Sequence, residues 1–235
     1  MKPAVDGTQN VLDACNAAGT IKRLVITSSV AAVIAPMKAD FPADSTFDES
    51  NWTHPESENL HPYRKSKTVA ERLAWDFQEK LPADKKFEIV TICPGFIMGP
   101  SIASGDALSE NWAIGIVTGT TKSITKKTFP FVDVRDTALA HLYAVKVDEA
   151  ANQRFLLVED TLRWIDAAQM IADEFTPRGF PVTLTEDAEG DLTKCICKRE
   201  KSEKVLGVKY TPMRQSLKDM IESMIASGKV KEPTK

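Results

Sequence analysis

Two short apolar runs, each preceded by a helical pattern, limit the folds that this sequence can adopt. Residues 3–18 carry apolar side chains at helical spacing, and an apolar run at 23–28 follows them. The order then repeats, with a helical pattern from Tyr63 to about residue 80 and an apolar run at 87–93. Helices that alternate with short buried strands are typical of an α/β fold with a parallel sheet.

The second helical pattern opens with a tyrosine and a lysine four residues apart. Pro62 lies where the first residue of the helix is expected, so Tyr63 and Lys67 fall one turn apart on one face. A cation near a phenol favours the ionised phenol, and a phenol so placed can exchange a proton with a substrate hydroxyl or carbonyl. Taken alone, the pattern also fits a surface aromatic residue beside a solvated lysine.

Hydroxyl and Pro-Gly residues follow the two apolar runs. Ser28 and Ser29 come at the end of the first run, and Pro94-Gly95 ends the second. Ligands of parallel α/β sheets bind at the carboxyl ends of the strands. Ser28 and Ser29 are therefore placed where their hydroxyls can hydrogen-bond a substrate oxygen.

Together these stretches resemble the extended branch of the short-chain dehydrogenase/reductase superfamily, which is epimerase/dehydratase-like. Within that branch the sequence is similar to the group of dihydroflavonol, cinnamoyl-CoA and methylglyoxal reductases. The segments that carry the likeness are residues 2–12, 22–29, 63–74, 94–96 and 131–136. The resemblance implies the C-terminal part of a doubly wound, Rossmann-type parallel sheet with a smaller mixed α/β lobe that binds substrate.

The resemblance also implies a role for each matching residue. Ser29 corresponds to the serine that orients the substrate carbonyl, and Tyr63 to the proton donor. Lys67 corresponds to the residue that holds the nicotinamide ribose and tunes the tyrosine, so Tyr63 and Lys67 both contact the cofactor. The residues of the loop that flanks the nicotinamide are Pro94, Phe96 and Ile97. The implied cofactor is NADP, with NAD as the alternative.

One large part of the family pattern is absent from these 235 residues. They contain neither G-x-x-G-x-x-G nor G-x-G-x-x-G, and the likeness begins at the helix that follows the family's fourth strand. At about 30 residues per βαβ unit, roughly 80–90 residues are expected ahead of it. We therefore expect that the chain is truncated and inactive alone. A gene-model truncation, a short isoform and a pseudoenzyme would each explain the missing segment.

The predicted domain division follows from the resemblance. Residues 1–160 are expected to form the partial dinucleotide-binding domain, and residues 161–235 the C-terminal substrate-binding lobe. Residues 101–128 contain scattered apolar side chains among Ser, Gly and Thr, so they are expected to be irregular, and the resemblance implies that they face the substrate. Residues 181–185 are predicted to form a short strand.

Two further predictions concern single residues. Asp136 precedes the helical pattern of residues 138–145 and is expected to cap that helix. The segment 47–52 resembles the family's Asp-Glu-Ser-x-Trp sequence, and the favoured interpretation is a packing loop with Trp52 as its plug.

Composition excludes several functional classes. The net charge is −3, which makes a nucleic-acid partner unlikely. Since no apolar run approaches about 18 residues, no membrane-spanning helix is expected. The four cysteines are scattered, and Cys195-x-Cys197 lacks the spacing of a zinc site, so we expect no metal and a cytoplasmic protein.

The leading hypothesis is an NADP(H)-dependent reductase of a small carbonyl substrate. Hydride would come from the nicotinamide and the proton from Tyr63. One alternative is a sugar-nucleotide epimerase or dehydratase, although residues 100–130 offer no obvious arginine cluster for a diphosphate. Another is a truncated, non-catalytic fragment with a binding function. The strand at 23–28 is also expected to be an open sheet edge, through which the chain can self-associate.

Overall fold

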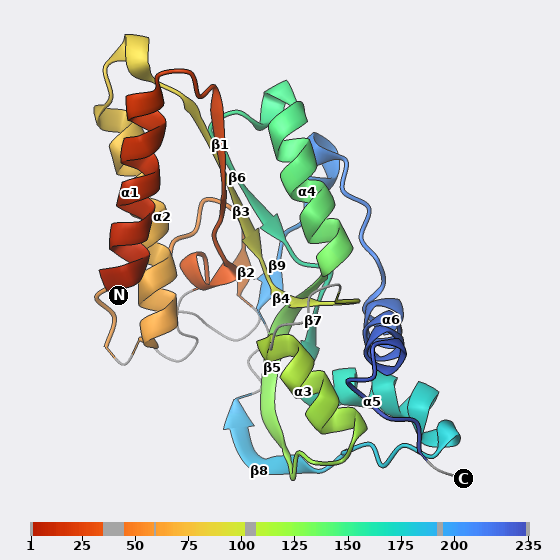
Figure 1. Ribbon diagram of the computed structural model, residues 1–235. Helices are drawn as coiled ribbons and strands as arrows, with labels where there is room; N and C mark the ends of the chain where they lie inside the picture. Colours follow the sequence, from red (N-terminus) through yellow and green to blue (C-terminus); the bar gives the residue numbers. More distant parts are fainter. Residues whose placement is uncertain (1, 35–44, 59, 102–106, 192–194, 234–235) are drawn as a thin grey trace. The chain divides into compact units, whose positions relative to one another are not determined.

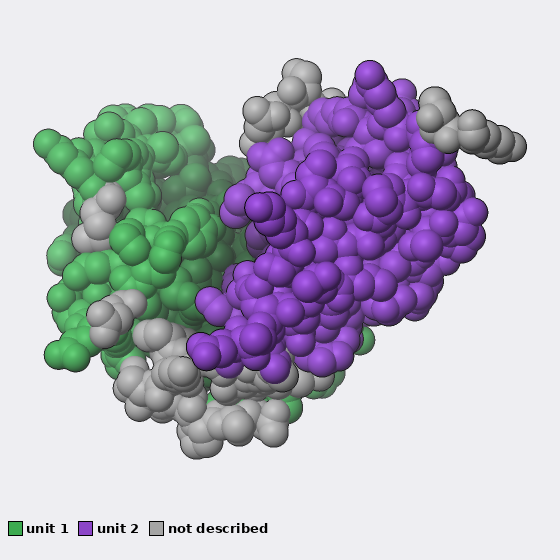
Figure 2. All heavy atoms as spheres, turned by 90° about the horizontal axis from the view of Figure 1, so that it is seen from below, with its two compact units in different colours: residues 1–95, 138–157, 196–208 green, residues 96–137, 158–195, 209–235 purple. Residues whose placement is uncertain are grey.

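The fold was analysed in a computed structural model that describes residues 2–34, 45–58, 60–101, 107–191 and 195–233. The chain forms two compact units (Figure 2). Unit 1 comprises residues 1–95, 138–157 and 196–208, and unit 2 comprises residues 96–137, 158–195 and 209–235. Each unit is described separately below.

Unit 1 is built on a parallel sheet of three strands in the order β1-β3-β6. The strands are β1 (Arg23–Thr27), β3 (Glu88–Pro94) and β6 (Gln153–Leu157). In the register, Thr27 pairs with Ile92 and Val90 pairs with Gln153. This arrangement confirms the predicted α/β class, and it places β1 at an edge of the described sheet.

Helices cover both faces of this sheet. The long helices α1 (Lys2–Ala18) and α2 (Pro62–Lys80) lie side by side on one face, and α4 (Val134–Lys146) lies on the other (Figure 1). Between the two long helices and the sheet is an apolar core that includes Leu12, Ala74, Phe87 and Ile89. Burial of these side chains fixes which face of α2 is turned to the sheet and which face remains available for chemistry.

Local signals set the ends of the two long helices. Gly19 follows α1 with a φ of +64°, a left-handed conformation that glycine adopts without steric cost. Helix α2 begins at Pro62, as predicted, and the His61 ring accepts a hydrogen bond from the Tyr63 amide. The Leu81-Pro82 sequence ends α2. Unit 1 also contains the two-stranded parallel pair β2 (Thr46–Phe47) and β9 (Ile196–Cys197).

Unit 2 contains a second sheet, in which β5 is the central strand. Strand β5 (Ile124–Asp133) pairs in parallel with β4 (Phe96–Met98) and β8 (Glu186–Asp191) and antiparallel with β7 (Asp160–Arg163). The helices of this unit are α3 (Leu108–Val117), α5 (Trp164–Phe175) and α6 (Met213–Ala226). The core of unit 2 includes Phe131, Ile171, Phe175, Leu217 and Met220.

Three of the local predictions for unit 2 were wrong. Residues 108–117 form helix α3, because Ala113, Ile116 and Val117 supply a buried helical face within a sequence rich in Ser and Gly. Residues 181–185 are not a strand, and β8 begins at Glu186. Asp136 does not cap α4, because it lies inside the helix and its carboxylate accepts hydrogen bonds from the amide and hydroxyl of Thr211.

Candidate active site

The predicted proton donor lies on the first turn of α2. The side chain of Tyr63 is largely accessible, with 51% of the residue exposed. Its amide donates to Nδ1 of His61 at 3.2 Å, which satisfies one of the free amides at the helix start. The phenol is therefore held on a rigid element while its hydroxyl remains available to a ligand.

Lys67 lies one turn further along α2 and reaches the end of β1. Its Nζ donates to the carbonyl oxygen of Thr27 at 3.2 Å. The ammonium has three N–H groups, and this contact uses one of them. Lys67 also borders a cavity of about 180 Å³, whose lining residues are Ala4, Thr8, Ile26, Thr27, Ser28, Lys67, Ala70 and Glu71. The structure thus brings Lys67 to the predicted serine segment.

Ser29 begins a short 3-10 turn, Val30–Ala32, directly after β1. Its Oγ accepts a hydrogen bond from the Ala31 amide at 3.1 Å. A hydroxyl that accepts in this way keeps its proton for donation to another group. Only 8% of Ser29 is exposed. The turn is fixed to α2 by Arg64, which donates to the Ile34 carbonyl oxygen at 2.5 Å.

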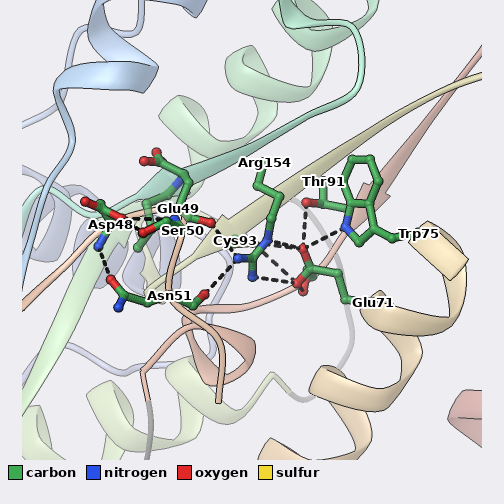
Figure 3. Close-up of polar contacts among 11 residues, drawn as sticks. Asp48, Glu49, Ser50, Asn51, Glu71, Trp75, Thr91, Cys93 and Arg154 are labelled. Carbon is green, nitrogen blue, oxygen red and sulfur yellow. Dashed lines mark hydrogen bonds and ion pairs between the residues drawn. The ribbon is translucent and has the colours of Figure 1, made fainter. Parts of the chain in front are cut away.

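Glu71 of α2 and Arg154 of β6 form a buried ion pair (Figure 3). Glu71, only 1% exposed, follows Lys67 by one helical turn. Its Oε1 accepts from Arg154 Nε at 2.7 Å and from Thr91 Oγ1 at 2.8 Å, and its Oε2 accepts from Ser28 Oγ at 2.5 Å. Burial raises the pKa of Glu71, but the hydrogen bonds and the charge of Arg154 outweigh burial, so the pKa lies below its ordinary value.

Arg154 extends the same network to residues 48–52. Its Nη1 donates to the carbonyl oxygens of Glu49 at 2.6 Å and Asn51 at 2.8 Å. Its guanidinium lies 3.6 Å from the centroid of the Trp52 ring. Oε1 of Glu49 in turn accepts from the Leu156 amide of β6. These contacts confirm the packing interpretation of Trp52.

Sequence reasoning missed the Glu71–Arg154 pair. The two residues are 83 positions apart, so no local pattern joins them. One signal was present: Glu71 falls between Ala70 and Ala74 on the helix face that also carries Lys67. A carboxylate on the face of α2 that packs against the sheet requires a buried partner.

The predicted nicotinamide-flanking residues are divided between the two units. Pro94 is buried at the end of β3, and the following amide, that of Gly95, donates to the Leu157 carbonyl oxygen. Phe96 and Ile97 belong to β4 of unit 2. The Phe96 ring makes an edge-to-face contact with the Trp164 ring, at a centroid distance of 5.0 Å.

Two other kinds of site were sought in the part of the chain that the structure describes. Within it, no group of three or more His, Cys, Asp or Glu side chains is arranged to hold a metal ion. None of its helices is both long enough and apolar enough to cross a bilayer.

Sequence comparison places the chain among reductases. Residues 1–156 match the 3-beta hydroxysteroid dehydrogenase/isomerase family. Cinnamoyl-CoA reductase 1 of Petunia hybrida is 30% identical to the chain over 242 residues, which cover 100% of the chain and 68% of the petunia protein.

Comparison with solved structures gives the same result. The yeast methylglyoxal/isovaleraldehyde reductase Gre2, solved in complex with NADPH, superposes with a TM-score of 0.82 and 25% identity. The match covers 97% of this chain and 71% of the yeast chain. Gre2 from Candida albicans also gives a TM-score of 0.82, with 31% identity over 97% of this chain and 72% of its own.

Proposed function

The chain belongs to the 3-beta hydroxysteroid dehydrogenase/isomerase family, and we propose that it is an NADPH-dependent reductase of a small carbonyl compound. The observation that carries this proposal is the arrangement on α2. The exposed phenol of Tyr63 lies one turn before Lys67, whose ammonium contacts the strand end that leads into Ser29. The methylglyoxal reductase that shares this fold was solved with NADPH, which supports the choice of cofactor.

The residues fit the nicotinamide end of such a cofactor. The remaining N–H groups of Lys67 can donate to ribose hydroxyls, and the cavity beside Lys67 is lined mainly by small and hydroxyl-bearing side chains. The hydroxyl oxygen of Tyr63 can accept a hydrogen bond from the same ribose, which leaves the proton of the phenol for the substrate. We assign Pro94 at the end of β3, and Phe96 and Ile97 of β4, to the segment that flanks the nicotinamide. When bound, the nicotinamide supplies the hydride that reduces the carbonyl carbon.

The chain's own residues complete the reaction with a proton. Tyr63 Oη donates its proton to the carbonyl oxygen as that oxygen gains negative charge, so the product is an alcohol and the phenol is left as phenolate. We assign to Lys67, one helical turn from Tyr63, the positive charge that offsets the negative charge left on the phenolate oxygen. The hydroxyl of Ser29 donates to the same carbonyl oxygen and thereby orients the substrate.

We assign the dinucleotide side to residues 1–160, except that residues 101–128 contribute to the substrate side. The rest of the substrate side is assigned to a C-terminal lobe of residues 161–235. The relatives suggest the first substrates to assay, namely methylglyoxal, isovaleraldehyde and cinnamoyl-CoA. The scattered cysteines support a cytoplasmic location.

The test is the pair of substitutions Tyr63→Phe and Tyr143→Phe in the protein expressed from its own gene. Each removes one phenol hydroxyl, but Tyr143 lies on α4 and takes no part in the proposed chemistry. General acid catalysis contributes roughly 10²–10⁴-fold to a rate. We expect kcat for NADPH-dependent carbonyl reduction to fall by about that factor in Tyr63→Phe and to stay at the parent value in Tyr143→Phe. Equal rates in all three proteins would show that Tyr63 is not the proton donor.

A further inference from the structure

The residue between Thr27 and Ser29 has no part in the reaction just described. Ser28 is 4% exposed, so its hydroxyl is not presented to solvent. Instead, Ser28 Oγ donates to Oε2 of Glu71 at 2.5 Å. A hydroxyl that donates to a buried carboxylate makes a short hydrogen bond of about twice the usual strength.

The acceptor of this bond is itself held in place. Glu71 receives two nitrogens of Arg154, at 2.7 and 3.3 Å, and the hydroxyl of Thr91 at 2.8 Å. Bidentate pairing with a guanidinium fixes both the position and the plane of a carboxylate. Arg154 is itself anchored to the backbone carbonyls of Glu49 and Asn51. The carboxylate of Glu71 is therefore held in a fixed position, in which it accepts the hydrogen bond of Ser28.

Helix α2 carries both Glu71, which binds Ser28, and Tyr63, the proposed proton donor. Tyr63, Lys67 and Glu71 are spaced four residues apart on α2, and therefore lie along one side of the helix. Lys67 holds the backbone of Thr27, and Glu71 holds the side chain of Ser28. The end of β1 is thus tied to α2 at two consecutive residues, immediately before Ser29.

We propose that Ser28 is a positioning residue: its hydrogen bond to Glu71 sets the distance between the hydroxyl of Ser29 and the phenol of Tyr63. This inference rests on the proposed reductase function. Without the bond, the backbone of Ser28 is still held to β3, where its amide donates to the Ile92 carbonyl oxygen at 2.7 Å, but the side chain of Ser28 no longer ties residues 28 and 29 to α2. The two groups that contact the substrate oxygen then no longer keep their fixed separation.

Thr91 provides a matched control within the network. Like Ser28, it is buried and donates one hydroxyl hydrogen bond to Glu71, but it lies in the middle of β3 rather than beside Ser29. Ser28→Ala and Thr91→Val each remove one donor from the same carboxylate. A merely structural role for the two hydroxyls predicts similar effects on activity, whereas a positioning role for Ser28 does not.

The experiment compares kcat and KM of Ser28→Ala, Thr91→Val and Ser28→Thr with those of the parent. Displacing a catalytic group by about 1 Å can lower a rate about 100-fold. A displacement of Ser29 by a fraction of an ångström in Ser28→Ala should therefore lower kcat about tenfold. We expect KM in Ser28→Ala to change less than about twofold, because both ground-state contacts remain. Ser28→Thr keeps a hydroxyl that can donate to Glu71, so kcat should return to near the parent value.

Two results would overturn the positioning role. One is an equal loss of kcat in Ser28→Ala and Thr91→Val, and the other is an unchanged kcat in Ser28→Ala. Tyr63→Phe, measured beside them, separates this inference from the proposed function. If Tyr63→Phe is inactive and Ser28→Ala is fully active, only the role of Ser28 fails. If Tyr63→Phe keeps the parent rate, the role of Tyr63 as proton donor fails, and the role of Ser28 fails with it. If the parent protein itself reduces no carbonyl with NADPH, the proposed function fails.

Discussion

Replacing Arg154 by methionine should destabilise unit 1 more than any surface substitution. Arg154 donates to Glu71, to the carbonyl oxygens of Glu49 and Asn51, and lies over the ring of Trp52. Arg154→Met preserves much of the side-chain volume but leaves a carboxylate that is 1% exposed without its counter-charge. Removing one partner of a buried ion pair costs about 3–5 kcal/mol. We expect a loss of that size in the free energy of unfolding near neutral pH.

The size of this loss should depend on pH. In the parent, the pKa of Glu71 lies below its ordinary value of 4.5, so the carboxylate contributes stability that is present above that value and is lost as the pH falls through the folded-state pKa. In Arg154→Met, burial remains and the counter-charge is gone, so the pKa of Glu71 should lie above 4.5. Stability of the variant then falls as the pH rises through that pKa. The difference between parent and variant should therefore be larger at about pH 7.5 than at about pH 5.

Urea denaturation at the two pH values measures the difference in the free energy of unfolding between parent and variant. Hydrogen exchange of the β3 amides reports the stability of unit 1 alone. Lys65→Met is the control within unit 1, because the ion pair of Lys65 with Glu56 is exposed and such pairs contribute about 0–1 kcal/mol. The double variant Glu71→Gln/Arg154→Met removes both charges, and it should be more stable than Arg154→Met alone. A loss below 1 kcal/mol in Arg154→Met, or a loss that grows towards pH 5, would refute the reasoning.

Two further predictions concern Lys67 and the sheet edge. Lys67→Met removes the cation that is proposed to hold the nicotinamide ribose and to offset the charge of the phenolate, so kcat should fall and KM for NADPH should rise; kinetic constants that match the parent would contradict this role. Strand β1 has no neighbour on its outer side among the described residues, and unpaired edges associate with other chains. A polypeptide of these 235 residues should therefore self-associate in light scattering as its concentration increases, and Val25→Lys should reduce the association; a monomer at all concentrations would exclude it.

Local patterns were sufficient to predict the elements that carry the proposed chemistry. The apolar run at 23–28 and the Pro62-Tyr63 helix start gave β1 and α2 almost to the residue, because strand burial and helix initiation depend on near neighbours. The resemblance supplied the roles of Ser29, Tyr63 and Lys67. These roles stay predictions until the variants are assayed.

Contacts between distant residues account for most of what the sequence did not predict. Asp136 precedes the helical pattern of residues 138–145 in the sequence, yet it lies inside α4 and its partner is Thr211, 75 residues away. Glu71 also has a partner that is distant in the sequence, namely Arg154 of β6. Helix α3 was missed for another reason: Gly115 and the neighbouring Ser and Thr residues hid a helical face that becomes evident only when Ile116 is seen buried in the core of unit 2.

The most direct test of the proposed function follows the hydride itself. The protein, expressed from its own gene, is incubated with a carbonyl substrate and NADPH that carries deuterium at the nicotinamide carbon from which hydride leaves. Mass spectrometry of the product then locates the label. A reductase places deuterium on the carbinol carbon of the alcohol, in a one-to-one ratio with the NADPH consumed, and this is the result we predict. Product that forms without deuterium, or while the NADPH concentration stays constant, would contradict the assignment.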